Sequence, residues 1–139
     1  MQTIPTVGVL IFKDDKVLMV RHGEKASHLT GSYGIPAGRL ETDETTLQAA
    51  IRELEEETGL VTTQNDLEEL PLTIPPADIL RKDGTTKRFK ITVFLCRKYS
   101  GKLQATEETT PEWVKITDIA HFPLIGHTKQ MVEEGKKFL

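Results

Sequence analysis

The sequence predicts an α/β or α+β fold with a central mixed sheet, and two features of its patterning support this class. Short apolar runs rich in β-branched residues predict strands along much of the chain. Apolar stripes of helical period at 43–58 and 127–139 predict two amphipathic helices. Strands combined with helices in this way are typical of a layered domain that packs helices against a sheet.

The first strands are predicted near the N-terminus. The run TVGVLIF at 6–12 carries apolar side chains on both faces, which is typical of a strand in the middle of a layered structure. The segment KDDK at 13–16 predicts a hairpin turn, and VLMV at 17–20 predicts the returning strand. Residues 21–41 hold four glycines and one proline, so we expect a long functional loop there.

The central helix is predicted over 43–58, where apolar residues recur on one face. Thr42 or Asp43 is expected to cap its start, because such side chains accept hydrogen bonds from the first turn. Gly59 stands where a glycine usually ends a helix. The remaining predicted elements are a short strand before Pro75-Pro76, a turn at 81–87, strands at 88–99 and 112–116, a helical turn at 117–120 and the helix at 127–139.

Length and composition limit the classes of function. The chain of 139 residues predicts a single domain, 1–139. A net charge of −3 offers no basic field for a nucleic-acid polymer. The lone cysteine, Cys96, lies in an apolar run and is predicted to be a buried thiol. With no secretory leader and no bilayer-length apolar run, we expect a cytoplasmic protein without a membrane partner, and a homodimer is compatible with the sequence.

The segment RELEEETGL at 52–60 places four glutamates at the end of the predicted helix. Negative charge there is unfavourable, because the C-terminal end of a helix is already negative. At 100° per residue, Glu53, Glu56 and Glu57 share one face, whereas Glu55 points towards solvent.

Three converging carboxylates need positive charge, and the single Arg52 cannot neutralise them all. A dense set of oxygen ligands suits a hard divalent cation such as Mg²⁺ or Mn²⁺, which often completes its shell with substrate phosphates. The alternative is a merely solvated helix face. The histidines, which show no ligand spacing, are expected to be surface or loop residues: His22, His28, His121 and His127.

The segment GRLETDETTLQAAIRELEEETGL at 38–60 resembles the Nudix box, GX5EX7REUXEEXGU with U apolar. Every fixed position matches: Gly38, Glu44, Arg52, Glu53, Leu54, Glu56, Glu57, Gly59 and Leu60. A chance match of the specified residue types is on the order of 10⁻⁸ or less per start position. The resemblance therefore favours the metal site over the solvated face.

The resemblance implies an α/β/α sandwich with a central mixed sheet, in which the box forms a loop–helix–loop. It also implies a hydrolase that cleaves a pyrophosphate bond in a nucleoside diphosphate linked to another moiety X, with Mg²⁺ as cofactor and Mn²⁺ as a substitute. The partner is then a small nucleotide-like molecule.

The resemblance also implies roles for individual residues. The implied metal ligands are Glu53, Glu56, Glu57, the carbonyl of Gly38 and an acidic residue before the last strand, best matched by Glu107 with Glu108 next. The implied catalytic residues are Glu53 as general base, Arg52 and Glu56. The implied structural residues are Glu44, which holds the loop–helix geometry, and Gly59, which closes the helix.

Substrate contacts are predicted from residue types outside the metal site. Cationic side chains are needed to neutralise the remaining phosphate charge. The candidates flanking the glycine-rich loop are Arg21, Lys25 and Arg39. Aromatic side chains able to stack on a base are Tyr33, Phe89 and Phe122.

Three functions are compatible with the resemblance. For a compact chain we expect a nucleoside triphosphate pyrophosphohydrolase of the MutT type. The alternative is an ADP-ribose pyrophosphatase, which is often marked by a proline about as far after the box as Pro75 and Pro76, 15 and 16 residues past Leu60. These prolines are equally explained as the end of a strand. An alternative of another class is a non-catalytic nucleotide-binding module.

Overall fold

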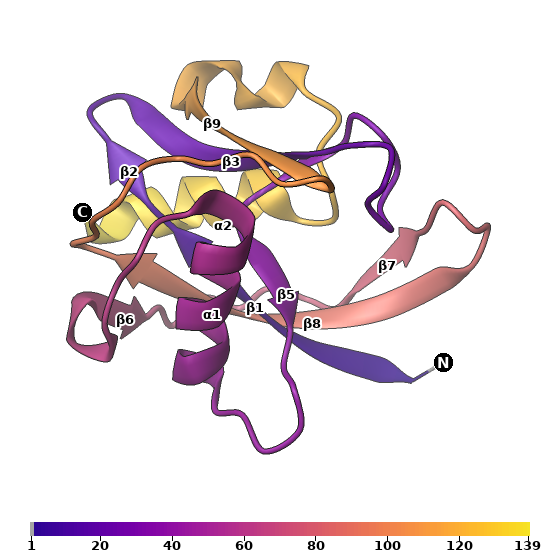
Figure 1. Cartoon of the computed structure of the whole chain (residues 1–139), viewed down its shortest axis with the longest axis horizontal. Helices are drawn as coiled ribbons and strands as arrows, with labels where there is room; N and C mark the ends of the chain where they lie inside the picture. The colour runs from indigo at the N-terminus through magenta and orange to yellow at the C-terminus, as the bar shows by residue number, and fades with distance from the viewer. Residues whose placement is uncertain (1) are drawn as a thin grey trace.

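The computed structural model describes residues 2–139, so residue 1 of the expected domain lies outside the described residues (Figure 1). The strands are β1 (Thr3–Leu10), β2 (Phe12–Lys13), β3 (Lys16–His22), β4 (Tyr33–Gly34), β5 (Ala37–Arg39), β6 (Leu67–Glu69), β7 (Ala77–Leu80), β8 (Thr86–Cys96) and β9 (Thr109–Lys115). The α-helices are α1 (Thr46–Thr58) and α2 (Thr128–Gly135). Short 3-10 turns occupy Gln64–Asp66, Ile116–His121 and Lys136–Phe138.

The strands form two sheets. In the first, β1 pairs in parallel with β8 and antiparallel with β5, and β8 also pairs antiparallel with β6 and β7. In the second, β3 pairs antiparallel with β2, β4 and β9. Figure 1 shows the second sheet above the first, with α1 in front. The mixed sheet predicted from the sequence is therefore confirmed, and an antiparallel sheet accompanies it.

Side chains of β1 alternate between two hydrophobic cores. Val7 and Val9 pack in one core with Leu54 of α1. Leu10 points the other way and packs in a second core with Met131 of α2. The first sheet therefore carries α1 on one face and α2 on the other, which confirms both the predicted sandwich and the prediction of a strand buried on both faces.

The start of α1 differs from the prediction. The helix begins at Thr46 rather than at residue 43, and Thr45 is its N-cap instead of Thr42 or Asp43. Asp43 has a φ of 63°, in the left-handed region, which excludes it from a right-handed helix. The apolar periodicity thus begins before the residue at which the backbone becomes helical.

Three strands were not expected, and the C-terminal helix differs in length from the prediction. The segment 21–41 is not a continuous loop, because β4 and β5 form within it by pairing with β3 and β1. The strand β7 follows Pro75-Pro76 and pairs with β8 across the predicted turn at 81–87. The C-terminal helix is shorter than predicted, since α2 ends at Gly135 and passes into a 3-10 turn.

The other predicted elements agree with the structure. The clearest predicted strand, at 88–99, corresponds to β8, and the helical turn at 117–120 lies within Ile116–His121. Cys96 is buried, as predicted. Among residues 2–139, no helix combines the length and the apolar character that crossing a bilayer requires.

Candidate active site

The ends of α1 are defined by local hydrogen bonds. The Thr45 hydroxyl accepts the Gln48 N–H at 3.1 Å, and Gln48 Oε1 accepts the Thr45 N–H at 3.0 Å, which together make a capping box. Gly59 has a φ of 83° and donates its N–H to the carbonyl of Glu55. A side chain at residue 59 would also meet the carbonyl of Lys102 at 2.7 Å. These contacts fix where the glutamates at the end of α1 lie.

Two of these glutamates face β5. Glu57 Oε1 accepts the N–H of Ala37 at 2.7 Å. Glu53 lies so close to Gly38 that a Cβ on residue 38 would overlap its carboxylate. Its side chain is only 13% exposed, whereas that of Glu56 is 56% exposed. Glycine at position 38 is therefore what lets the Glu53 carboxylate lie against the backbone of β5.

Arg52 connects the loop before α1 to the acidic face. Its Nε and Nη2 donate to the two carboxylate oxygens of Glu44 at 2.7 and 2.8 Å. Its Nη1 donates to Glu53 at 2.7 Å and to Glu56 at 3.1 Å, and Nη2 also reaches the carbonyl of Arg39 at 2.9 Å. The hydrogen bonds from Arg52 lower the pKa of Glu44 to about 2. Arg52 thus orients Glu53 and Glu56, while Glu44 holds Arg52.

The carboxylates of Glu53 and Glu57 are largely shielded from solvent, and Arg52 pairs with Glu53 whereas a backbone N–H reaches Glu57. Burial raises the pKa of Glu57 to about 8, against the lowering effect of the Ala37 N–H, and the nearby charges of Glu53 and Glu108 raise it further. Burial also raises the pKa of Glu53, although the hydrogen bond from Arg52 opposes this. Ionising both groups together is therefore unfavourable unless a cation joins them.

These residues fit a hard divalent cation. Glu53 and Glu57 supply oxygen ligands, burial raises both pKa values, and Gly38 lies directly beside the Glu53 carboxylate. Within residues 2–139, however, the side chains do not already gather three His, Cys, Asp or Glu residues in a metal-holding group. Arg52 Nη1 contacts both Glu53 and Glu56, so it competes with a cation for their oxygens.

Of the two glutamates before β9, Glu108 is electrostatically closer to the acidic face. Its charge is among those that raise the pKa of Glu57, and its carbonyl accepts the N–H of Gly23 at 2.7 Å. The Glu107 side chain is 82% exposed and pairs with Lys25 at 3.6 Å. These contacts favour Glu108 as a further ligand, the reverse of the order expected from the sequence.

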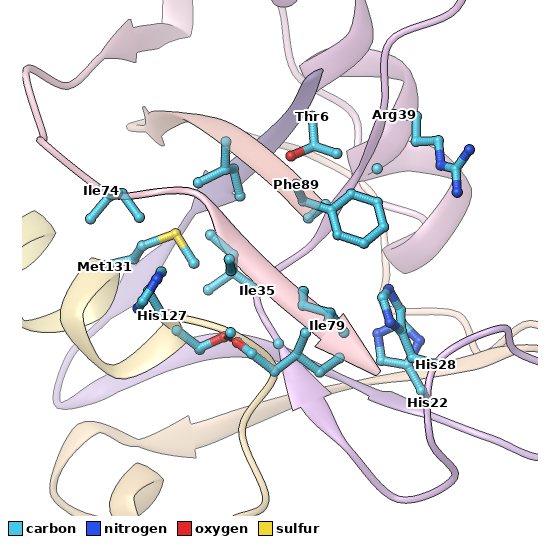
Figure 2. Close-up of a pocket in the computed structure, with 18 of the residues that line it drawn as sticks. Thr6, His22, His28, Ile35, Arg39, Ile74, Ile79, Phe89, His127 and Met131 are labelled. Carbon is cyan, nitrogen blue, oxygen red and sulfur yellow. Dashed lines mark hydrogen bonds between the residues drawn. The ribbon is translucent and has the colours of Figure 1, made fainter. Parts of the chain in front are cut away.

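A cavity lies beside the acidic face, and β5 forms part of its wall. Strands β1, β7 and β8 and the start of α2 supply further parts of its wall, and connecting segments supply many of the other lining residues. Figure 2 shows aliphatic side chains, including Ile35 and Ile79, along its middle. Met131 and His127 lie at one end, and Arg39, Phe89, His22 and His28 lie at the other. Gly38 also lines this cavity, so the cavity and Glu53 meet at the same backbone.

The predicted substrate residues are divided between the cavity and other places. Arg39 and Phe89 line the cavity. Tyr33 is buried elsewhere, where its hydroxyl donates to Glu112 at 3.0 Å and its ring packs on Phe122. Arg21 lies 3.8 Å from the same glutamate. The structure therefore brings Arg39 and Phe89 to a ligand-sized space, but not Tyr33 or Arg21.

Three cavity residues were missed as functional candidates. The expectation of a surface or loop residue is wrong for His22, which is buried at the end of β3, and His28 contacts it with ring centroids 4.8 Å apart. Burial and neighbouring cations lower the pKa of both rings to about 4. Arg81 follows β7 and lines the same space. An extension of the predicted strand at 17–20 would have found His22, but nothing local indicates Arg81.

Comparison with known proteins gives a consistent picture. The family profile of the NUDIX domain matches residues 2–135. An 8-oxo-dGTP diphosphatase of Proteus vulgaris is 31% identical over 96 residues, 69% of this chain and 77% of that protein. The 8-oxo-dGDP phosphatase NUDT18 of Mus musculus is 29% identical over 138 residues. That match covers 95% of this chain but only 38% of the mouse protein.

Solved structures share the same architecture. The crystal structure of a MutT NUDIX hydrolase from Burkholderia pseudomallei superposes with a TM-score of 0.73 at 25% identity. The match covers 96% of this chain and 98% of that one. Similarity therefore extends over the sheets and both helices as well as the glutamate segment.

Proposed function

Because this chain belongs to the Nudix family of pyrophosphohydrolases, we propose that it is a Mg²⁺-dependent nucleoside triphosphate pyrophosphohydrolase. The reaction would add water to one phosphorus and release a nucleoside monophosphate and pyrophosphate. The observation that carries the proposal is the packing of Glu53 and Glu57 against β5, on the backbone that also lines the cavity. The glutamates that would hold the cation and the phosphates therefore lie next to the cavity proposed for the rest of the substrate.

The glutamates of α1 would hold the cation in this proposal. Glu53, Glu56 and Glu57 are the side-chain ligands, joined by the Gly38 carbonyl and by Glu108, with Glu107 as the alternative. When bound, Mg²⁺ would neutralise phosphate charge and act as a Lewis acid.

The other roles belong to groups already positioned by the fold. Glu53 is the candidate general base, because its carboxylate is shielded from solvent and its raised pKa favours taking a proton from water. Arg52 keeps Glu53 and Glu56 oriented through its hydrogen bonds. Glu44 supports Arg52 from the loop.

The cavity is the candidate site for the nucleoside. Its aliphatic middle suits the faces of a base, and His127 and Thr128 offer polar atoms at the start of α2. The similarity to an 8-oxo-dGTP diphosphatase supports a triphosphate substrate.

ADP-ribose is the second candidate substrate. Pro75, one of the two prolines that suggested it, lines the cavity and does not end a strand. A non-catalytic binding module is disfavoured, since the chain retains all three box glutamates.

The test is turnover of a panel of nucleoside triphosphates, ADP-ribose and related diphosphates with and without Mg²⁺, read by phosphate release and mass spectrometry. We expect hydrolysis only with the cation, and a fall in kcat of about 10²- to 10⁴-fold in Glu53→Gln. Glu55→Gln is the matched control, because Glu55 lies on the same helix but is exposed. A folded protein that hydrolyses no member of the panel would contradict the proposal.

A further inference from the structure

Two arginines from distant parts of the chain meet at one end of the cavity. Arg39 ends β5, and Arg81 follows β7. Their Cζ atoms lie 5.6 and 5.8 Å from the ring centroid of Phe89. Burial, and then the charge of Arg39, lower the pKa of Arg81, which agrees with the two guanidinium groups lying at the same end of the cavity. Figure 2 shows Arg39 beside Phe89 at this end.

Neither guanidinium forms a close ion pair among residues 2–139, although the charge of Asp83 acts on Arg81 and opposes the lowering of its pKa. By contrast, each of three other arginines holds a carboxylate at 2.7 Å, namely Arg52, Arg88 and Arg97. No Asp or Glu side chain lines the cavity. Arg39 is exposed and Arg81 is half-buried, and two like charges beside one ring make this end of the cavity suited to an anion.

A spare hydrogen-bonding atom lies on the same wall. His28 Nδ1 is buried and has no hydrogen-bond partner in the described protein. The His28 ring lies 6.3 Å from the Phe89 ring. Buried polar atoms are nearly always paired in native proteins, so this nitrogen is an unpaired polar atom in the wall beside Phe89.

The arginine pair lies across β5 from the glutamates. In the pairing of β5 with β1, Gly38 stands opposite Val7 and Arg39 stands opposite Thr6. Successive residues of a strand face opposite sides. Gly38 faces Glu53 and α1, so the Arg39 side chain faces the cavity, where Thr6 also lies. An anion held by Arg39 and Arg81 is therefore not the group that lies beside Glu53.

The backbone beside Arg81 is anchored by contacts of the next residue, Lys82. The Lys82 ammonium donates to the carbonyls of Gly23 and Glu24. The Lys82 N–H donates to the carbonyl of Ser27 at 3.2 Å. These contacts anchor the turn between β7 and β8 on the segment 23–27, and a cation on an anchored backbone loses less freedom when it binds an anion.

We propose that Arg39 and Arg81 form an anion subsite in the cavity, which takes a phosphoryl group of the substrate other than the one held beside Glu53. The planar forks of two guanidinium groups match phosphate oxygens and the charge of a dianion. This inference rests on the proposed function, because it presumes a substrate that already carries a pyrophosphate. The phosphoryl group could belong to the far end of a longer phosphate chain or to the ribose.

The first test is binding of inorganic pyrophosphate in excess EDTA, measured by calorimetry. Without a cation the glutamates repel the ligand, so binding reports the arginines. We expect Arg81→Ala and Arg39→Ala to bind about tenfold more weakly than the wild type, and Arg81→Lys to lie between. Arg97→Ala is the matched control, since it removes the same charge beyond the far end of β8, and its affinity should equal that of the wild type.

Two results would overturn the subsite. One is equal affinity in wild type and Arg81→Ala, each verified as folded by circular dichroism. The other is no binding to the folded wild type at millimolar pyrophosphate. Turnover plays no part in this measurement, so a failure of the proposed hydrolysis cannot be mistaken for a failure of the subsite.

The second test distinguishes the two sources of the phosphoryl group. Adenosine 5′-diphosphate, adenosine 5′-triphosphate and adenosine 5′-diphosphate 3′-phosphate are compared in EDTA, so that the base cancels. A gain of about tenfold for the triphosphate assigns the subsite to the phosphate chain, and a gain for the 3′-phosphate assigns it to the ribose. Either gain should vanish in Arg81→Ala. If neither compound binds more tightly than the diphosphate, the inference is wrong.

Discussion

At the scale of single residues, the site depends on carboxylates placed where their charge is unfavourable. Glu57 is held by one backbone N–H, from Ala37, and burial raises its pKa to about 8. The chain therefore keeps a group whose ionised form is destabilised until positive charge arrives. Such a group adds little to the stability of the protein alone, and its value lies in binding.

Glu57→Gln should separate these two contributions. The amide has the same shape and carries no charge, so we expect the melting temperature without metal to be unchanged or raised. The stabilisation that millimolar Mg²⁺ gives the wild type should be lost, because linkage requires binding to the folded state. Thermal unfolding with EDTA and with Mg²⁺ measures both. A fall of many degrees in EDTA would show that Glu57 is mainly structural.

Gly38→Ala should disrupt the contact between β5 and α1. The added Cβ overlaps the Glu53 carboxylate, so the side chain or the strand must shift, at a cost of about 1–3 kcal/mol. Activity should fall together with stability. Gly34→Ala is the control for stability, since its Cβ would meet Ile125 and Thr128 at ordinary contact distances of 3.6 Å or more. Equal melting temperatures of the two variants in denaturation experiments would argue against close packing at Gly38.

At the scale of elements, α1 determines the spacing of the acidic face, and its capping box determines where α1 begins. Thr45 and Gln48 exchange hydrogen bonds at the start of the helix, ahead of the turns that carry the glutamates. The cap and the glutamates therefore serve different purposes on one helix. Losing the cap should weaken the helix without altering the chemistry at its other end.

Thr45→Ala should lower the free energy of unfolding by about 1 kcal/mol. The activity of the folded fraction should be unchanged, because Thr45 lies at the opposite end of α1 from Glu57. Thr42→Ala is the control: Thr42 is exposed and does not cap the helix, so its effect on stability should be small. Urea unfolding compares the three proteins. A larger loss in Thr42→Ala than in Thr45→Ala would contradict the observed cap.

At the scale of the whole molecule, one wall of the cavity is assembled from segments distant in sequence. His22 belongs to β3 and His28 to the segment after it, while Arg39 ends β5 and Arg81 follows β7. The rings of the two histidines contact each other, and the pKa of each is lowered to about 4, first by burial. Protonation of His22 and His28 therefore destabilises the folded protein.

The contribution of His22 and His28 to the free energy of unfolding should fall as the pH falls from about 6.5 towards 4, whereas Glu57, with its raised pKa of about 8, contributes in the opposite direction. In that window the unfolded chain binds protons at His22 and His28, whereas the folded protein does not, so acid favours unfolding. His28→Gln should reduce the slope, and His121→Gln, whose side chain is exposed, should leave it unchanged. Urea unfolding at several pH values measures the slopes. Identical slopes for wild type and His28→Gln would contradict this account.

The acidic face could be predicted from the sequence because its information is local. The spacing of Glu53, Glu56 and Glu57 determines a shared helical face wherever the helix packs, since the period of a helix is constant. The alternating apolar residues of 6–12 likewise predicted a strand buried on both sides. The predicted start of α1 was too early, because the apolar periodicity does not reveal the left-handed backbone at Asp43.

Only the tertiary structure decided what lies around that face. The pairing of β5 with β1 turns Gly38 towards Glu53 and Arg39 into the cavity, and the pairing of β7 with β8 positions Arg81 beside it. Tyr33 lies outside the cavity, where it contacts Glu112 and Phe122. These outcomes depend on strand register between distant segments, which no local spacing records. The sequence by itself thus determined the chemistry of the glutamates, and the register of the sheet decided which cations and which cavity adjoin them.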